Sequence, residues 1–139
     1  MNRKTLLGDP PTIHITSQDF SRLDLLVESL SGKANTSILE FLRDELDRAQ
    51  LVADADAAPP FVRIGSRVVF GDEQGMTYRL TLRLPEQTSG DPSEISIVTP
   101  VGAALLGLSE GQSISYETPD NRIKTITVLR VGENLSRIP

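Results

Sequence analysis

The residues in this sequence that could perform chemistry are few and scattered. Histidine occurs once, at His14, and cysteine does not occur. A zinc site takes several nitrogen or sulfur ligands, which these residue types cannot supply. The serines have no histidine-based general base, because His14 stands in no recognisable triad context. His14 is therefore interpreted as an ordinary residue of a short strand, and neither a nucleophilic triad nor a metal site is predicted.

Carboxylates are the remaining candidates for acid–base chemistry. Those in the segment predicted to form a helical hairpin are Asp24, Glu28, Glu40, Asp44, Glu45 and Asp47. Acid–base work or metal binding needs carboxylates that converge at one place. The tip of the hairpin has no acid and carries Lys33, while Asp72 and Glu73 occupy a β-turn, where acids are common. No glycine-rich phosphate-binding motif occurs either, so no catalytic residue and no cofactor is predicted.

The composition argues against two further classes of protein. The 139 residues carry a net charge of −5, which disfavours nucleic-acid binding by phosphate neutralisation. Four phenylalanines, two tyrosines and no tryptophan argue against a base-stacking platform, so no strong direct nucleic-acid binding is predicted. No window approaches the roughly 18 apolar residues of a membrane span, and the N-terminus lacks a secretory apolar region. We expect a cytoplasmic protein whose partner is another protein.

Two amphipathic helices are predicted after a short strand at residues 12–16. The first begins at Thr16, with Asp19 as the reciprocal acid of a capping box, and ends at Gly32. The second begins at Ser37, where Glu40 completes a similar pattern. Their apolar stripes are Phe20, Leu23, Val27 and Leu30, and Leu39, Leu42, Leu46 and Ala49. Because the connection is short, the helices must be antiparallel, and roughly 14 residues each give a hairpin about 21 Å long.

The hairpin admits two interpretations. It could pack on a core shared with the rest of the chain, or it could protrude as a short coiled coil, which the narrow stripes with few aromatics favour. The segment ADADAAPP is small, acidic and closed by two prolines that cannot continue a helix. The predicted organisation is therefore a coiled-coil hairpin at 12–52, a linker at 53–60 and a sheet domain at 61–139.

Alternating apolar residues predict a mostly antiparallel sheet in the second part. Its strands are expected at 66–70, 76–84, 94–99, 112–118 and 122–131, separated by turn residues. The only helix of this part is predicted after Thr99, a capping residue, with Pro100 at the first helical position. Gly102 indicates a close backbone approach, and Gly107 ends the helix. The fold class is thus α+β.

The order of these parts resembles the Gre family of bacterial transcription elongation factors. The residues that carry the resemblance are GSRVVF at 65–70, EISIVTPVGAALLGLSEGQSISYETP at 94–119 and ITVLRV at 126–131. The short hairpin ending in ELDRAQ, at 45–50, is more similar to the Rnk group of that family, described as regulators of nucleoside diphosphate kinase. The resemblance covers residues 12–131 and implies an FKBP-like α+β fold for the sheet domain.

The resemblance also implies RNA polymerase as the partner. In Gre factors the C-terminal domain docks at the rim of the secondary channel, and the coiled coil presents acidic residues at its tip to the catalytic magnesium. The docking residues correspond here to Ser96, Val98, Thr99 and Pro100, although Gre factors often have a polar or acidic residue at the position of Val98.

The hairpin tip departs from the Gre pattern. It contains Gly32, Lys33 and Asn35 but no acidic pair, and a hairpin of about 21 Å is much shorter than the Gre one. Presenting carboxylates to magnesium needs both reach and oxygen ligands. We therefore expect a non-catalytic transcription regulator that binds polymerase near the secondary channel and competes with Gre-type factors without stimulating RNA cleavage.

Two alternatives stay open. The resemblance to Rnk also implies a regulator of nucleoside diphosphate kinase, or of another enzyme, with no polymerase contact. The FKBP-like fold suggests a peptidyl-prolyl isomerase, but fold does not carry activity. Such an enzyme needs an aromatic-lined pocket, and this part of the chain offers only Phe61, Phe70, Tyr78 and Tyr116.

Overall fold

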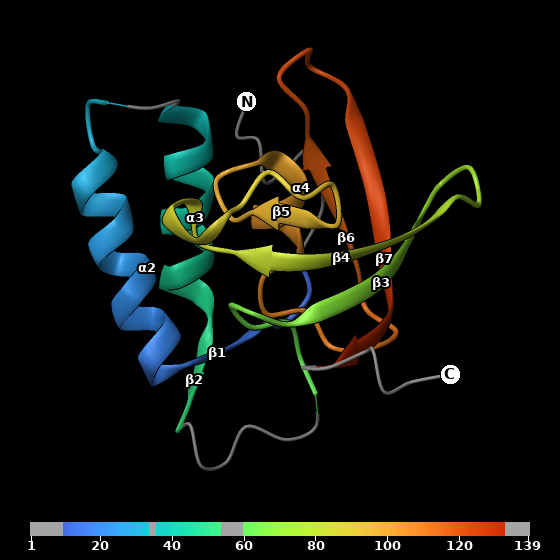
Figure 1. Ribbon diagram of the computed structural model, residues 1–139, viewed down its shortest axis with the longest axis horizontal. Helices are drawn as coiled ribbons and strands as arrows, with labels where there is room; N and C mark the ends of the chain where they lie inside the picture. The colour runs from blue at the N-terminus through green and yellow to red at the C-terminus, as the bar shows by residue number, and fades with distance from the viewer. Residues whose placement is uncertain (1–9, 34–35, 54–59, 133–139) are drawn as a thin grey trace.

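Two helices stand beside a curved five-stranded sheet, and both parts contribute to one hydrophobic core (Figure 1). The structure is a computed structural model, and it describes residues 10–33, 36–53 and 60–132. Helices α2 (Ser17–Leu30) and α3 (Thr36–Arg48) run antiparallel as a hairpin. At its base, strands β1 (His14–Thr16) and β2 (Gln50–Val52) pair in parallel.

The local signals at the start of the hairpin act largely as predicted. The Thr16 hydroxyl caps α2 by accepting a hydrogen bond of 3.1 Å from the Asp19 amide. The Asp19 carboxylate accepts a bond of 3.0 Å from the Ile64 amide, which ties α2 to the segment before the sheet. The prediction that Ser37 caps the second helix, in a box with Glu40, is wrong. Because α3 begins at Thr36, Ser37 already lies within the helix, whereas a capping residue flanks it.

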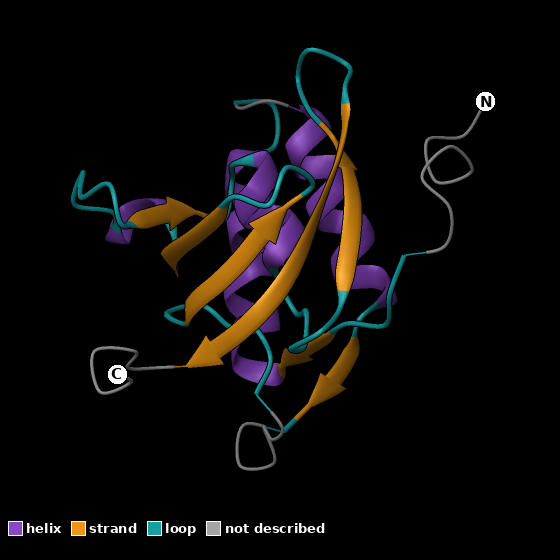
Figure 2. Cartoon of the chain, turned by 90° about the vertical axis from the view of Figure 1, so that its right-hand side faces the viewer, coloured by secondary structure: helices purple, strands orange, loops and turns teal. Residues whose placement is uncertain are grey.

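The sheet has the strand order β5-β4-β3-β7-β6. Its strands are β3 (Arg67–Asp72), β4 (Thr77–Arg83), β5 (Glu94–Ser96), β6 (Ser113–Glu117) and β7 (Ile123–Gly132). Only the β4–β5 pairing is parallel, so the prediction of a mostly antiparallel sheet is confirmed. The short 3₁₀-helix η2 (Pro85–Gln87) begins the connection from β4 to β5. Figure 2 shows the strands in front of the helices.

The strand predicted at 94–99 is shorter than expected. β5 ends at Ser96, because the Ser96 carbonyl turns back to accept a bond of 3.1 Å from the Thr99 amide. The helix predicted after this turn is α4 (Pro100–Leu105), and its buried residues are Gly102, Ala103, Ala104 and Leu105.

The hairpin packs against the sheet domain rather than protruding from it. One buried cluster joins the two parts. It contains residues of α4 and of strands β3, β4, β6 and β7, together with the core-facing hairpin residues Leu23, Val27, Leu42 and Leu46. A backbone hydrogen bond also joins the two parts, because the His14 amide donates to the Gly107 carbonyl at 3.1 Å. Of the two interpretations of the hairpin, the one with a shared core therefore describes the molecule.

Part of the predicted organisation lies outside the described residues. The linker at 53–60 falls mostly in the undescribed range 54–59, and the sheet domain is described only to Gly132. The division into parts at this linker thus stays a prediction. Within the described ranges, no helix is both long enough and apolar enough to cross a membrane.

Candidate functional site

Ser96, Val98, Thr99 and Pro100 come together where β5 turns into α4. The Thr99 hydroxyl donates to the Ser96 carbonyl at 2.7 Å and accepts from the Gly102 amide at 3.1 Å. The Val98 amide donates to the Ser96 hydroxyl at 3.2 Å. All four residues are half-buried. This corner, defined as residues 96–100, is held in one shape by its own hydrogen bonds.

Gly102 makes the corner possible. A Cβ atom at this position would lie 2.1 Å from the Ser96 carbonyl oxygen and 2.9 Å from the Thr99 hydroxyl. No side chain fits there, so the predicted close backbone approach is confirmed. Pro100 occupies the first helical turn, where the N–H that proline lacks has no partner within the helix. Gly107 follows the helix with φ of +78°, as predicted.

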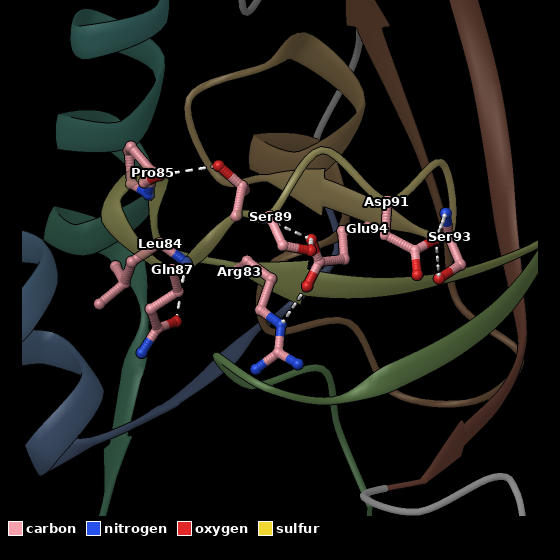
Figure 3. Close-up of polar contacts among 9 residues, drawn as sticks. Arg83, Leu84, Pro85, Gln87, Ser89, Asp91, Ser93 and Glu94 are labelled. Carbon is pink, nitrogen blue, oxygen red and sulfur yellow. Dashed lines mark hydrogen bonds and ion pairs between the residues drawn. The ribbon is translucent and has the colours of Figure 1, made fainter.

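The connection from β4 to β5 fixes the other end of the short strand β5 (Figure 3). The Glu94 carboxylate accepts bonds of 2.8 and 2.9 Å from the amide and hydroxyl of Ser89, and one of 3.1 Å from Arg83. The bonds from Ser89, supported by the Arg83 guanidinium, lower the pKa of Glu94. The Asp91 carboxylate accepts from the amide and hydroxyl of Ser93, which lowers the pKa of Asp91. The sequence predicts only turns in this connection and does not predict its hydrogen-bond network.

A groove of about 160 Å³ opens beside Pro100, and α3 forms one of its walls. Its apolar lining includes Ile38 and Phe41 from the hairpin, Tyr116 from β6 and Pro119 from the turn after it. The rest of the lining is polar: Ser37, Glu117, Thr118 and Asn121. Sequence reasoning missed Phe41 as a neighbour of the corner. Its apolar character was the only available signal, and it does not show which part of the chain the helix face contacts.

The residues predicted at the hairpin tip are not brought to the corner. Gly32 follows α2 with φ of +78°, and Lys33 is exposed, while Asn35 lies outside the described residues. Neither Gly32 nor Lys33 lines the groove beside Pro100. Across the hairpin, the Arg43 guanidinium pairs with Asp24 at 2.8 Å.

The described part of the chain contains no group of three or more histidines, cysteines or acidic residues that could hold a metal ion. His14 is half-buried and lies against Phe61, with 5.7 Å between the ring centroids.

A larger cavity, of about 600 Å³, lies on the concave face of the sheet. Three of the four aromatic residues of this domain line it: Phe70, Tyr78 and Tyr116. Phe70 and Tyr78 are stacked with 5.3 Å between their centroids, and the Tyr78 hydroxyl donates to Asp72 at 3.0 Å. The small number of aromatics therefore no longer argues against an aromatic-lined pocket, although a pocket alone carries no isomerase activity.

Three ionisable groups at this cavity have shifted pKa values. Desolvation opposes ionisation of Asp72, but bonds from the Met76 amide, the Tyr78 hydroxyl and the Gln74 amide outweigh it and lower the pKa of Asp72. The hydrogen bond to Asp72 raises the pKa of Tyr78. Burial, together with the negative charges of Glu73 and Asp72, raises the pKa of Tyr116. Both tyrosines are therefore protonated hydrogen-bond donors at neutral pH.

Both parts of the chain match families of known proteins. Residues 49–133 match the family described as "Transcription elongation factor, GreA/GreB, C-term", and residues 11–52 match the Rnk N-terminus. The "Regulator of nucleoside diphosphate kinase" of Escherichia coli K12 is 36% identical over 122 residues, covering 87% of this chain and 89% of that protein. The transcription elongation factor GreA of Roseiflexus castenholzii is 35% identical over 95 residues, covering 65% and 57% of the two chains.

A solved structure shows the same architecture. A prokaryotic transcription elongation factor GreA/GreB from Nitrosomonas europaea superposes with a TM-score of 0.68 at 35% identity, covering 86% of this chain and 98% of that one. The fold places the chain in a class of proteins with a helical hairpin joined to a small curved sheet, which here has one helix after β5. The chain belongs to the GreA/GreB family of transcription elongation factors, and its N-terminal part is of the Rnk type. The predicted family and fold class are confirmed.

Proposed function

We propose that this chain is a non-catalytic transcription regulator that docks on RNA polymerase near the secondary channel through the corner at 96–100. It competes there with Gre-type factors and does not stimulate RNA cleavage. The family match supports the kind of partner, since the GreA relatives are named as transcription elongation factors. The observation that carries the docking site is the corner itself, a hydrogen-bonded edge next to a groove of mixed polar and apolar lining.

The corner is suited to binding because little has to change when a partner arrives. Ordering a loop on binding and desolvating unpaired polar groups both reduce affinity. Here the amide and hydroxyl groups of Thr99 are already paired within the chain. Pro100 and Phe41, which line the same groove, supply apolar surface for the contact.

The hairpin lacks the features that stimulation of RNA cleavage would need. Residues 31–36 contain no carboxylate, and a magnesium ion in a transition state needs oxygen ligands. The helices have 14 and 13 residues, which corresponds to about 20 Å of reach, and they lie along the sheet domain instead of extending from it. The chain therefore occupies the docking site without delivering acids to the catalytic centre.

Binding of purified core RNA polymerase to the immobilised chain tests this proposal. Pro100→Asp is expected to weaken binding at least tenfold, because it places a charge in the apolar contact. The fold should survive, since an acid suits the first turn of a helix. Pro92→Asp, an exposed proline at the other end of β5, changes the net charge equally and should bind as the wild type does.

Two further readouts complete the test. A Gre factor should displace the wild-type chain, and stalled complexes should release no cleaved RNA when the chain is added. If the wild type does not bind polymerase, or if Pro92→Asp weakens binding as much as Pro100→Asp, the proposed docking site is wrong.

A second candidate function comes from the name of the Escherichia coli relative, a regulator of nucleoside diphosphate kinase. In this case the chain would act on that kinase, or on another enzyme, without contacting polymerase. Binding of purified nucleoside diphosphate kinase to the same immobilised chain, with polymerase as the parallel sample, separates the two candidates.

A further inference from the structure

The face of the sheet that points away from the core carries three arginines. In the sheet register, Val69 of β3 pairs with Arg79 of β4 on one side and with Arg130 of β7 on the other. Paired residues lie on the same face of a sheet, and so does Arg67, two residues before Val69. Because neighbouring strands are about 4.8 Å apart, the Cα atoms of Arg79 and Arg130 are about 10 Å apart. The helices and the core lie on the opposite face (Figure 2).

A β-bulge adds an apolar side chain to this outer face. The register of β7 against β3 shifts between Val69 and Phe70, because β7 has one extra residue there, Leu129. A bulge re-aims the side chains beside it, so the consecutive residues Leu129 and Arg130 both lie on the outer face. Leu129 lies over Gly71, where a Cβ atom would be 3.8 Å from its Cδ1 atom, and it is 48% exposed.

Val69 forms the floor between the arginines. Only 9% of it is exposed, although it does not belong to the core cluster on the other side of the sheet. Its neighbours Arg79 and Arg130 are both exposed. Arginines bury their hydrocarbon stems along apolar surface and keep their guanidinium groups in water. The charged ends of Arg79 and Arg130 therefore stand on either side of one apolar residue.

No described acid balances the charges of these arginines. Within the part of the chain that the structure describes, the side chains of Arg67, Arg79 and Arg130 form no ion pair and no hydrogen bond. The Glu110 carboxylate accepts a bond of 2.9 Å from the amide of the residue after Arg130, but it does not pair with that guanidinium. Other described arginines do form ion pairs with acids: Arg22, Arg43, Arg48, Arg83 and Arg122.

The chemistry of the outer face fits a carboxylate-bearing polypeptide. Guanidinium groups bind carboxylates and phosphates alike. A long phosphodiester chain is disfavoured, because the net charge of −5 becomes −8 without the +3 of the three arginines, and the rest of the molecule repels a polyanion. The exposed Leu129 beside the arginines also favours a protein, since a sugar-phosphate backbone offers it no apolar side chain. Arginine next to apolar residues is typical of the centre of protein interfaces.

We propose that this outer face, defined by Arg67, Val69, Arg79, Leu129 and Arg130, binds an acidic segment of another protein. Carboxylates of the segment pair with the arginines, and an apolar side chain between them covers Leu129. The outer face belongs to β3, β4 and β7 and shares no residue with the corner at 96–100. The proposal therefore does not rest on polymerase docking.

Titration of the full ¹⁵N-labelled chain with a short acidic peptide tests the proposal by amide chemical shifts. The probe is acetyl-EELEE-amide. Its controls are acetyl-QQLQQ-amide, which lacks the charges, acetyl-EESEE-amide, which lacks the apolar side chain, and an oligothymidylate of equal charge. The probe should give saturable shifts at amides of β3, β4 and β7, at concentrations on the order of millimolar. The uncharged peptide should give none, and the serine peptide and the oligothymidylate should each bind about threefold more weakly.

Matched variants locate the site. Arg79→Gln and Arg130→Gln should each weaken the probe about threefold, and the double variant about tenfold. Arg122→Gln removes the same charge from the turn between β6 and β7, where the side chain is 73% exposed, and should leave binding intact. In Leu129→Ser the leucine and serine peptides should bind equally, because the apolar contact is then lost on one side already. Unchanged backbone spectra show that these variants are folded.

Several results would overturn the proposal. Absence of saturable shifts, equal shifts with acetyl-QQLQQ-amide, or equal losses in Arg79→Gln and Arg122→Gln would each do so. Binding of the oligothymidylate as tightly as the acidic peptide would assign the outer face to nucleic acid instead. Sedimentation of the wild type at increasing concentration covers the remaining occupant, since self-association that Arg79→Gln abolishes would assign the face to a second copy of the chain. Polymerase is absent from every sample, so these outcomes are independent of the docking test.

Discussion

The corner at 96–100 and the concave cavity meet at the same short helix, α4, but their polar groups are paired over different distances along the chain. At the corner, the Thr99 hydroxyl both donates to Ser96 and accepts from Gly102, and the Thr99 amide is paired as well. At the cavity, the Tyr78 hydroxyl of β4 donates to Asp72 of β3, and the Thr125 amide of β7 donates to Glu73. The polar groups of the corner are paired within one short segment of the chain, and those of the cavity wall are paired between strands.

This difference separates two ways of holding a surface in place. A corner whose polar groups are paired offers a partner shape and apolar contact, so its binding depends on rigidity. A cavity whose wall is held by hydrogen bonds between strands keeps its shape only while those strands stay paired. Variants that loosen the corner and variants that change the cavity should therefore have separable effects.

The largest effect is expected from Gly102→Ala. A Cβ atom 2.1 Å from the Ser96 carbonyl oxygen forces β5 and α4 apart, which should lower the free energy of unfolding by about 3 kcal/mol. Gly71→Ala is the matched control, because its Cβ would meet nothing nearer than 3.6 Å. That variant should change the free energy by less than about 1 kcal/mol. Urea unfolding measures both, and similar losses would show that the corner is not tightly packed.

Thr99→Val should have a smaller effect on the same corner. Valine keeps the shape but removes the hydroxyl that caps α4, a loss of about 1 kcal/mol in the free energy of unfolding. Thr127→Val is a suitable control, since its hydroxyl pairs with Ser113 on the solvent-facing side of the sheet. If both variants lose equal stability in urea, the cap contributes nothing specific to the corner.

Asp72→Asn addresses the wall of the cavity and its dependence on pH. The pKa of Asp72 is lowered in the folded chain, so its charged form contributes stability above the unfolded value of about 3.9. That contribution is lost as the pH falls through the lower folded value. The difference in stability between wild type and Asp72→Asn should therefore be present at neutral pH and vanish in acid. Asp47→Asn, an exposed residue of α3, controls for net charge.

The same variant has an optical readout. The hydrogen bond to Asp72 is the main cause of the raised pKa of Tyr78, whereas burial is the main cause for Tyr116. In Asp72→Asn the pKa of Tyr78 should fall, so that tyrosinate absorbance appears at lower pH. The pKa of Tyr116 should change less. An unchanged titration would mean that Asp72 does not hold the Tyr78 ring.

The corner could be predicted from sequence because its signals are local. A capping threonine, a proline at the first helical position and a glycine two residues later act within one turn of chain. The cavity could not be predicted in this way. Phe70, Tyr78 and Tyr116 come from three strands, and only the order β5-β4-β3-β7-β6 brings their side chains to one place.

The position of the hairpin shows the same limit. A narrow apolar stripe suits both a free coiled coil and a helix pair packed on a sheet, because each buries only one face per helix. The contacts that decide between them are long-range. Ile38 and Phe41 are partly buried against the shared core. Phe41 and Pro100 line the same groove although they lie far apart in the sequence, which no local pattern encodes.

The smallest effect is expected from Arg83→Met in the network before β5. The Arg83–Glu94 pair has an N–O distance of 3.1 Å, but the Arg83 side chain is 38% exposed, and such pairs contribute little in water. Glu94 keeps both bonds from Ser89 when Arg83 is replaced, so β5 should stay in place. The urea midpoint and the polymerase affinity should both remain near wild type. A tenfold loss of affinity with an unchanged midpoint would mean that Arg83 itself contacts the partner, and the docking surface would then extend from the corner along β4.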